Sequence, residues 1–255
     1  MLCFSHTRST HKCLMFPRHP YASTHLSLRP DVSGGATTHL PPVRLLRSAD
    51  LTELCAIDEK LMRKRVAHEA SEGRTAVAVM PDVESLEWHH AREDFVGKEL
   101  YDKIPEFRGA VVGTEPGTRV WCTWTRMWYN SDPKDAKGNT LHILRLVIED
   151  PGYTDYEAAS EKEAVAAKSS VVAAATAALL AAAQDEASRW NMGEIDIWNP
   201  TSATLAAGRM LDSSVQITDR QKDSISSLRW YGEGKDCADT RRQVEWLGNE
   251  KYAWC

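Results

Sequence analysis

The most constraining feature of this sequence is a short apolar run just past its middle. The run reads LHILRLVI over residues 141–148, and apolar side chains occupy both its odd and its even positions. Successive side chains of a strand point to opposite faces, so a strand with this pattern is apolar on both faces. Such a strand is stable where both faces of its sheet are covered. We therefore expect a central strand over 140–149, with helices on both sides of its sheet.

A long alanine-rich helix is expected after this strand. Ser160 and Glu163 form the S-x-x-E pattern of a capping box, which is worth about 1 kcal/mol and predicts one helix over 161–190. Because alanine has a small side chain, we expect this helix to lie close against the sheet. The residues expected at that contact include Val172, Leu179, Leu180 and Ala183.

The apolar part of this helix is too short to cross a membrane. Residues 171–183 are apolar except for Thr176, whereas a membrane span needs about 20 apolar residues. We therefore expect no membrane partner.

The charge of the chain argues against a nucleic-acid partner. The formal net charge is −5, and the first 43 residues hold only one of the 36 acidic residues and four of the 31 lysines and arginines. The remainder is therefore more acidic than the whole, and an acidic surface repels a phosphate backbone. Nine tryptophans do not make a stacking platform for bases without a positively charged groove.

The amino-terminal segment differs in composition from the rest. Residues 1–42 are rich in Arg, Ser, Thr and His and contain a single acid, Asp31. We expect a disordered basic tail there, or alternatively a mitochondrial transit segment, followed by one domain over 43–255. The six cysteines form no C-x-x-C pair and no signal peptide pattern precedes them, which indicates reduced thiols in an intracellular protein. We expect the cytoplasm, or mitochondria if the first segment directs import.

Apolar spacing predicts the other elements. Helices are expected over 51–70 and 83–101, capped by Asp50 and Asp82, with the apolar segment 75–82 between them. Further elements are expected as strands over 43–46, 109–113, 119–129, 194–200 and 224–232, a short helix over 201–211, and a last strand within 244–255. The short links between strands predict an α+β fold with a mixed, mostly antiparallel sheet and helices on both faces.

Several stretches resemble a known family. They read MPDVESLEWHHAREDF, LHILRLVIED, IDIWNP, SISSLRWYG and NEKYAWC. Together they look like the carboxyl-terminal domain of a fungal family of GNAT-type lysine N-acetyltransferases, over roughly residues 43–255. The resemblance implies the GNAT (acyl-CoA N-acyltransferase) fold, acetyl-CoA as cofactor, and lysine or a similar small amine as acceptor. In this family an upstream domain carries the acetyl-CoA site.

The loop that binds coenzyme A in GNAT enzymes is not found here. That loop carries Q/R-x-x-G-x-G/A, and its backbone N–H groups hold the pyrophosphate at a helix start. The corresponding stretch, EDPGYTDYEAASEKEAV, has one glycine, Gly152, and six acidic residues that would repel a pyrophosphate. Asn199, after the next strand, matches the family's cofactor-contacting asparagine, but the tyrosine that protonates the leaving thiolate falls at Ala206.

One group of aromatic, histidine and acidic residues is a candidate acceptor site. Trp88, His89, His90 and Glu93 lie on the helix expected over 83–101, and Trp124 and Trp128 share one face of the strand expected over 119–129. Adjacent histidines diverge by about 100° around a helix, so we expect no metal site. The alternative is that these side chains are partners within the core.

Two residues are candidates for acid–base catalysis. Glu149, at the end of the central strand, lies where GNAT enzymes often place the general base, and Tyr231 could donate a proton. The alternatives are a strand-end surface acid and a packed tyrosine.

Two functions therefore stay open. The first is an amine N-acetyltransferase in which the amine attacks the thioester of acetyl-CoA. The second is a non-catalytic GNAT-like domain that binds a protein partner, or an acceptor for a neighbouring catalytic domain.

Overall fold

The computed structural model describes residues 14–15, 24–30, 40–130, 132, 134–153, 163, 170–219, 229–230 and 244–254. Its strands are β1 (Leu14–Met15), β2 (Thr24–Leu28), β3 (Val43–Leu46), β4 (Thr75–Ala78), β5 (Gly109–Val112), β6 (Val120–Met127), β7 (Thr140–Ile148), β8 (Glu194–Trp198), β9 (Ile217–Asp219), β10 (Arg229–Trp230) and β11 (Val244–Leu247). Its helices are α1 (Ser48–Ser71), α2 (Val83–Tyr101), α4 (Val171–Arg189), α5 (Ser202–Leu211) and the 3-10 turn η1 (Lys251–Ala253).

A seven-stranded sheet forms the centre of the fold. Its strand order is β3-β5-β6-β7-β8-β2-β9, so β7 is the middle strand, as the apolar run predicts. Every neighbouring pair is antiparallel except β7 with β8, which is parallel. The predicted mixed, mostly antiparallel sheet is therefore confirmed.

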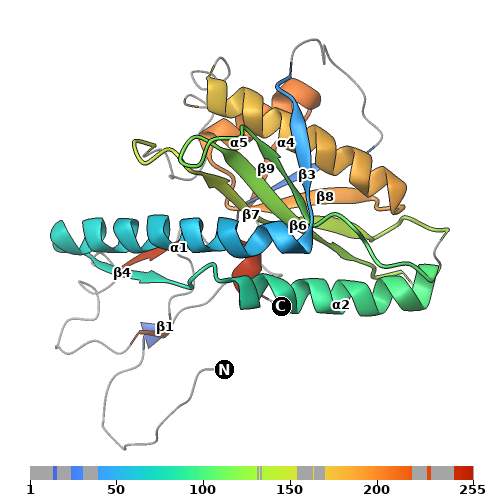
Figure 1. Ribbon diagram of the computed structural model, residues 1–255, viewed down its shortest axis with the longest axis horizontal. Coiled ribbons are helices and arrows are strands. Elements are labelled where there is room, and N and C mark those ends of the chain that lie inside the picture. Colours follow the sequence, from blue (N-terminus) through green and yellow to red (C-terminus); the bar gives the residue numbers. More distant parts are fainter. Residues whose placement is uncertain are drawn as a thin grey trace, which may run out of the picture.

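Helices cover both faces of this sheet (Figure 1). α4 and α5 lie on one face, where Leu141 and Ile143 of β7 join the larger core cluster with Leu179 and Leu180. α1 and α2 lie on the other face, where Val147 of β7 packs with residues of α1. The two apolar faces of β7 are thus both covered.

A β-bulge changes the direction of one side chain on β7. Thr123 of β6 pairs with Arg145 and Trp124 pairs with Ile143, which leaves Leu144 as the extra residue. A bulge places two successive residues on the same face. Leu144 therefore packs with α1 and α2, and Arg145 also points toward α1, where Asp58 binds it.

The helix after β7 differs from the prediction. α4 begins at Val171, because Ser170 is extended (ψ 148°) and its hydroxyl accepts a hydrogen bond from the Ala173 N–H at 3.0 Å. One helix over 161–190 is therefore wrong, although Glu163 is helical. Ser160 lies outside the described residues. Leu179, Leu180 and Ala183 are buried as expected, while Val172 is half-buried.

Of the two predicted helix caps, the one at Asp82 is confirmed and the one at Asp50 is wrong. Asp82 caps α2 by accepting a hydrogen bond from the Ser85 N–H at 2.8 Å, as predicted. α1 begins earlier than expected, with Arg47 as its N-cap. Asp50 lies one turn inside the helix and its carboxylate accepts the Arg47 N–H at 2.7 Å, so it closes a capping box and is not the N-cap.

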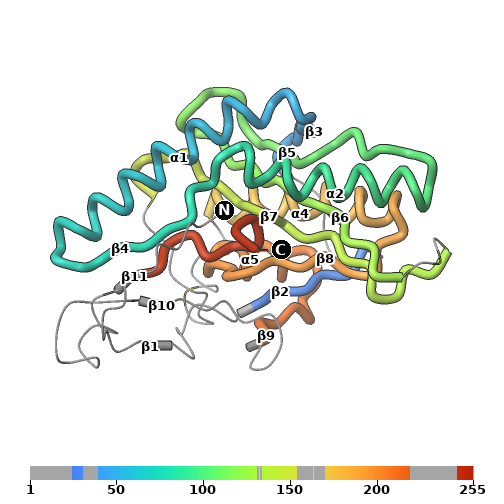
Figure 2. The backbone as a smooth tube through the Cα atoms, turned by 90° about the horizontal axis from the view of Figure 1, so that it is seen from below, coloured from blue at the N-terminus to red at the C-terminus, as the bar shows by residue number. Residues whose placement is uncertain are grey.

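Two small sheets lie beside the main one. β4 pairs in parallel with β11, so the apolar segment after α1 holds the carboxyl-terminal part of the chain (Figure 2). β1 pairs with β10, which is the described part of the strand expected over 224–232.

The amino-terminal segment contributes a strand to the main sheet. β2 lies between β8 and β9 and pairs antiparallel with both. Leu26 and Leu28 alternate with polar residues and are fully buried beside α5 and α4. Residues 24–28 are thus part of the core and not of a disordered tail.

No helix in the described part of the chain is long and apolar enough to cross a bilayer.

The role of β2 leads to a stability prediction. Leu26 is fully buried and lies against Gly208 of α5, so Leu26→Ala should lower the free energy of unfolding by about 2–5 kcal/mol. Ser27→Ala, at the exposed neighbouring position, is the matched control and should change it by less than about 0.5 kcal/mol. Urea unfolding measures both, and equal midpoints would show that β2 does not support the core.

Candidate functional site

The candidate site lies where β7 and β8 separate. Their parallel pairing runs from Thr140 with Glu194 to Ile143 with Ile197 and then stops. β8 ends at Trp198, while β7 continues to Ile148 with β6 as its partner. The resemblance to GNAT enzymes implies such an opening beside the strand that precedes the long helix.

The carboxyl-terminal segment of the chain fills this opening. The Glu250 carboxylate accepts a hydrogen bond from the Leu146 N–H at 3.0 Å and also binds the Arg145 guanidinium. η1 then packs against both β7 and α2. The Leu146 N–H, which has no acceptor on β8, thus donates to a side chain of the carboxyl-terminal segment.

The other side of the opening contacts the same segment. The Asn199 side-chain amide donates to the Asn249 carbonyl, and the Lys251 ammonium lies 4.9 Å from the centre of the Trp198 ring. Lys251 is buried there. Asn199, the expected cofactor residue, therefore holds the carboxyl-terminal segment in this structure.

Gly248 allows the segment to enter this position. Its φ is +61°, and a Cβ atom there would lie 2.5 Å from the Met62 terminal methyl and 3.1 Å from the Tyr252 hydroxyl. Only glycine fits without a shift of these neighbours. The Tyr252 hydroxyl donates to the Val79 carbonyl at 2.6 Å, and burial raises the pKa of this phenol.

Arg145 links this segment to α1. Its guanidinium makes two hydrogen bonds of 2.8 Å to the Asp58 carboxylate, and both side chains are buried. Burial raises the pKa of the Glu250 carboxyl, an effect that Arg145 opposes. A paired arginine between two carboxylates removes much of the cost of burying these charges.

Glu149, the expected general base, is buried and fully engaged. Its carboxylate accepts hydrogen bonds from the Arg119 guanidinium, the Gly117 N–H and the Trp121 indole, at 2.9 to 3.1 Å. Only 1% of Glu149 is exposed. This arrangement favours a structural role and leaves no oxygen directed at solvent. Tyr231 lies outside the described residues.

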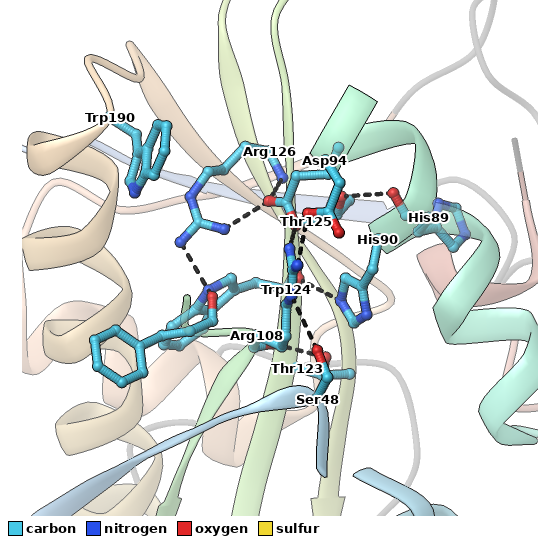
Figure 3. A network of polar contacts seen from close by, with 12 residues as sticks. Ser48, His89, His90, Asp94, Arg108, Thr123, Trp124, Thr125, Arg126 and Trp190 are labelled. Atoms are coloured by element: carbon cyan, nitrogen blue, oxygen red, sulfur yellow. Dashed lines mark hydrogen bonds and ion pairs between the residues drawn. The ribbon is translucent and has the colours of Figure 1, made fainter. Parts of the chain in front are cut away.

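The two histidines of α2 each bind a backbone carbonyl, and Figure 3 shows the contact of His90 with Trp124. His89 Nε2 donates to the Tyr252 carbonyl at 3.1 Å, and His90 Nε2 donates to the Trp124 carbonyl at 3.0 Å. Both rings are buried, and burial lowers the pKa of each to about 4. They are thus neutral donors that fasten α2 to η1 and to β6, whereas Trp88 is half exposed.

Glu93 forms the centre of a buried ion network. It binds Arg108 at 2.6 Å and the Arg126 guanidinium at 2.5 Å, and it also accepts the Arg126 N–H at 2.8 Å. Arg126 also binds the Glu186 carboxylate of α4. Its guanidinium carbon lies 5.3 Å from the centre of the Trp190 ring, and Figure 3 shows these two side chains. This network joins α2, β6 and α4.

The two tryptophans expected in the acceptor site belong to the core. Trp124 is fully buried and its indole donates to the Phe107 carbonyl at 3.2 Å. Trp128 packs against the rings of Tyr101 and Trp190, with centres 5.7 and 5.9 Å away. The structure brings the predicted acceptor residues into one region, with most of them facing other parts of the protein.

A further polar cluster was not predicted. Asp196 of β8 is fully buried, and its carboxylate accepts hydrogen bonds of 3.2 Å from His25 Nδ1 and from the Trp198 indole. The Nδ1 atom of His142, on β7, lies 3.5 Å from the Asp196 Oδ2 atom. The one signal in the sequence was a charged residue, Asp196, between two isoleucines of the strand expected over 194–200. No group of three or more His, Cys, Asp or Glu side chains in the described ranges is placed to hold a metal ion.

The lowered pKa values of His89 and His90 predict how stability depends on pH. In the unfolded chain each ring binds a proton near the ordinary histidine pKa of about 6.5, whereas in the folded chain it does so only near 4. The contribution of each neutral ring to the free energy of unfolding is therefore fully present above about pH 6.5. It falls by roughly 1.4 kcal/mol per pH unit for each ring as the pH decreases toward 4. His89→Gln and His90→Gln should each reduce this slope in urea unfolding at several pH values, while Trp88→Phe on the same helix should not. An unchanged slope in both histidine variants would contradict the assignment.

The contacts of Glu149 predict a stability effect for its substitution. Glu149→Gln leaves the buried Arg119 without its main carboxylate, which should lower the free energy of unfolding by about 3 kcal/mol. Glu53, the exposed second partner of Arg119, offers the matched control, since Glu53→Gln should cost less than about 1 kcal/mol. Thermal and urea unfolding compare the two, and an equal effect would show that the buried contact is not special.

The comparisons with known proteins agree with this architecture. A family model described as the LYC1 GNAT-like C-terminal domain matches residues 25–255. No curated protein and no solved structure matches the chain significantly. The match begins within β2, in accord with the place of that strand in the sheet. With nearly the whole chain covered and the central sheet and helices as described, this protein belongs to the LYC1 GNAT-like C-terminal domain family.

Proposed function

We propose that this chain is a non-catalytic GNAT-like domain of an amine N-acetyltransferase-type protein, acting as a binding module for a protein partner. The acceptor of that protein is lysine or a similar small amine. The main support is the hydrogen bond that the Leu146 N–H donates to the Glu250 carboxylate, inside the opening between β7 and β8.

The filled opening is the first support. Proteins of the GNAT fold generally bind acetyl-CoA, and the likeness to GNAT enzymes as a whole implies a cofactor beside the strand that opens, whereas in the resembling family an upstream domain carries the acetyl-CoA site. Here the backbone of this strand, the Arg145 side chain and Asn199 all bind residues 249–250. A cofactor at this position would have to displace the half-buried Glu250 carboxylate from the buried Arg145 guanidinium, which is costly because Arg145 would lose one of its two partners.

The acidic loop after β7 is the second support. Glu149 and Asp150 begin a stretch with six acids and a single glycine. The Asp150 carboxylate already accepts the Gly152 N–H at 2.8 Å, so this amide is not free for a phosphate. Each carboxylate near a pyrophosphate adds repulsion on the order of 1 kcal/mol at surface dielectric.

The third support is that the candidate acid–base residues already form hydrogen bonds within the domain. Glu149 accepts hydrogen bonds from three groups, and His89 and His90 donate to backbone carbonyls. A general base must reach the proton of the attacking amine directly or through one water. None of these three side chains is directed toward a common open position among the described residues.

Titration calorimetry with acetyl-CoA tests the proposal. We expect a dissociation constant above about 100 μM and no release of free coenzyme A above the uncatalysed rate when lysine is added. An active GNAT enzyme measured in the same buffer is the positive control. Micromolar binding together with lysine-dependent release of coenzyme A would overturn the non-catalytic assignment and favour the enzyme.

A further inference from the structure

One face of α2 carries an ordered stripe of exposed side chains. The stripe consists of Glu84, Trp88, Ala91, Phe95 and Lys98, which are all exposed. Their spacing alternates between four and three residues, so they lie in one line along the helix. We call these five residues the α2 stripe.

The α2 stripe is separate from the contacts that hold the helix. The opposite face of α2 packs inward through Leu86, His89, His90, Glu93 and Gly97. Trp88 is 50% exposed and Phe95 is 68% exposed, and α2 forms the outer layer of its side of the sheet (Figure 1). These two large apolar side chains lie about two turns apart on one face with Ala91 between them, so the middle of the exposed face is apolar.

The order of residues along the stripe is self-complementary. An acid and a base lie at its two ends, seven residues before and after Ala91. Trp88 and Phe95 lie between them and the central alanine. An antiparallel second copy, related by a two-fold axis at Ala91, therefore sets Glu84 against Lys98 and Trp88 against Phe95, twice. The small central side chain lets the helices approach closely.

The charges also favour the antiparallel arrangement over the parallel one. Two parallel copies would place Glu84 beside Glu84 and Lys98 beside Lys98, which is unfavourable. Lys98 now pairs with Asp102, the C-cap residue of α2, but both side chains are exposed, so this pair is weak and exchanges readily.

We propose that the α2 stripe is an isologous interface through which two copies of this chain associate antiparallel. This inference is independent of the non-catalytic assignment above, because it uses none of the residues of the opening. A single pair of helices is at the low end of specific interfaces, below about 1,200 Å² in total, so the dimer forms at micromolar concentration or above.

Sedimentation velocity of the full chain from about 5 to 500 μM tests the interface. The wild type should shift from monomer to dimer over this range, and Trp88→Ser with Phe95→Ser should remain monomeric. Glu84→Lys and Lys98→Glu each turn two attractive contacts into repulsive ones and should weaken the dimer about tenfold. The double variant with both changes restores opposite charges and should recover the wild-type constant.

Mixing the two single charge variants gives the sharpest result. One copy then presents only lysines and the other only glutamates at the ends of the stripe, so the mixture should associate more strongly than either variant alone. Lys60→Glu on α1 and Val171→Ser at the start of α4 are exposed controls and should leave association unchanged. A wild type that stays monomeric at all concentrations, or charge variants that associate like the wild type, would overturn the proposal. Circular dichroism confirms that each variant is folded.

Discussion

The hydrogen bond from the Leu146 N–H to the Glu250 carboxylate connects the main features of this structure. β7 loses its partner on one side after Ile143, because the pairing stops at Ile197 and β8 ends at Trp198. A buried N–H without an acceptor costs roughly 1–3 kcal/mol, so an opening of this kind needs an acceptor. In this chain the acceptor comes from 104 residues further along the sequence. The carboxyl-terminal segment is therefore part of the domain's core and supplies this acceptor.

Three buried arginines beside the middle of the sheet fasten the surrounding elements to it. Arg119 holds Glu149 at the end of β7, Arg126 joins Glu93 of α2 to Glu186 of α4, and Arg145 joins Asp58 of α1 to Glu250. Each arginine needs its carboxylates, because a buried charge without a partner is strongly destabilising. The acidic residues that look catalytic in the sequence are thus explained as partners of these arginines.

The sequence predicted the fold better than the site, and the reason is the range of the contacts. Apolar side chains at both the odd and the even positions of 141–148 identified the central strand, and Asp82 identified the start of α2. Both signals are local in the sequence. β2 was missed because its pattern, THLSL, is short and lies in a polar segment, and the break at Ser170 was missed because alanine continues on both sides. The partners of Glu149 lie up to 32 residues away and those of Arg145 up to 105. No spacing rule in the sequence gives such pairs, so the roles of these residues became clear only in three dimensions.

The chain's own carboxyl-terminal segment occupies the opening where the likeness to GNAT enzymes implies a cofactor. The most direct measurement is the NMR signal of the Leu146 amide in protein labelled with nitrogen-15 leucine. We expect an amide that exchanges slowly with solvent and that does not shift when millimolar acetyl-CoA is added, because Glu250 remains its acceptor. An amide that exchanges at once, or that shifts in a saturable way with acetyl-CoA, would contradict it.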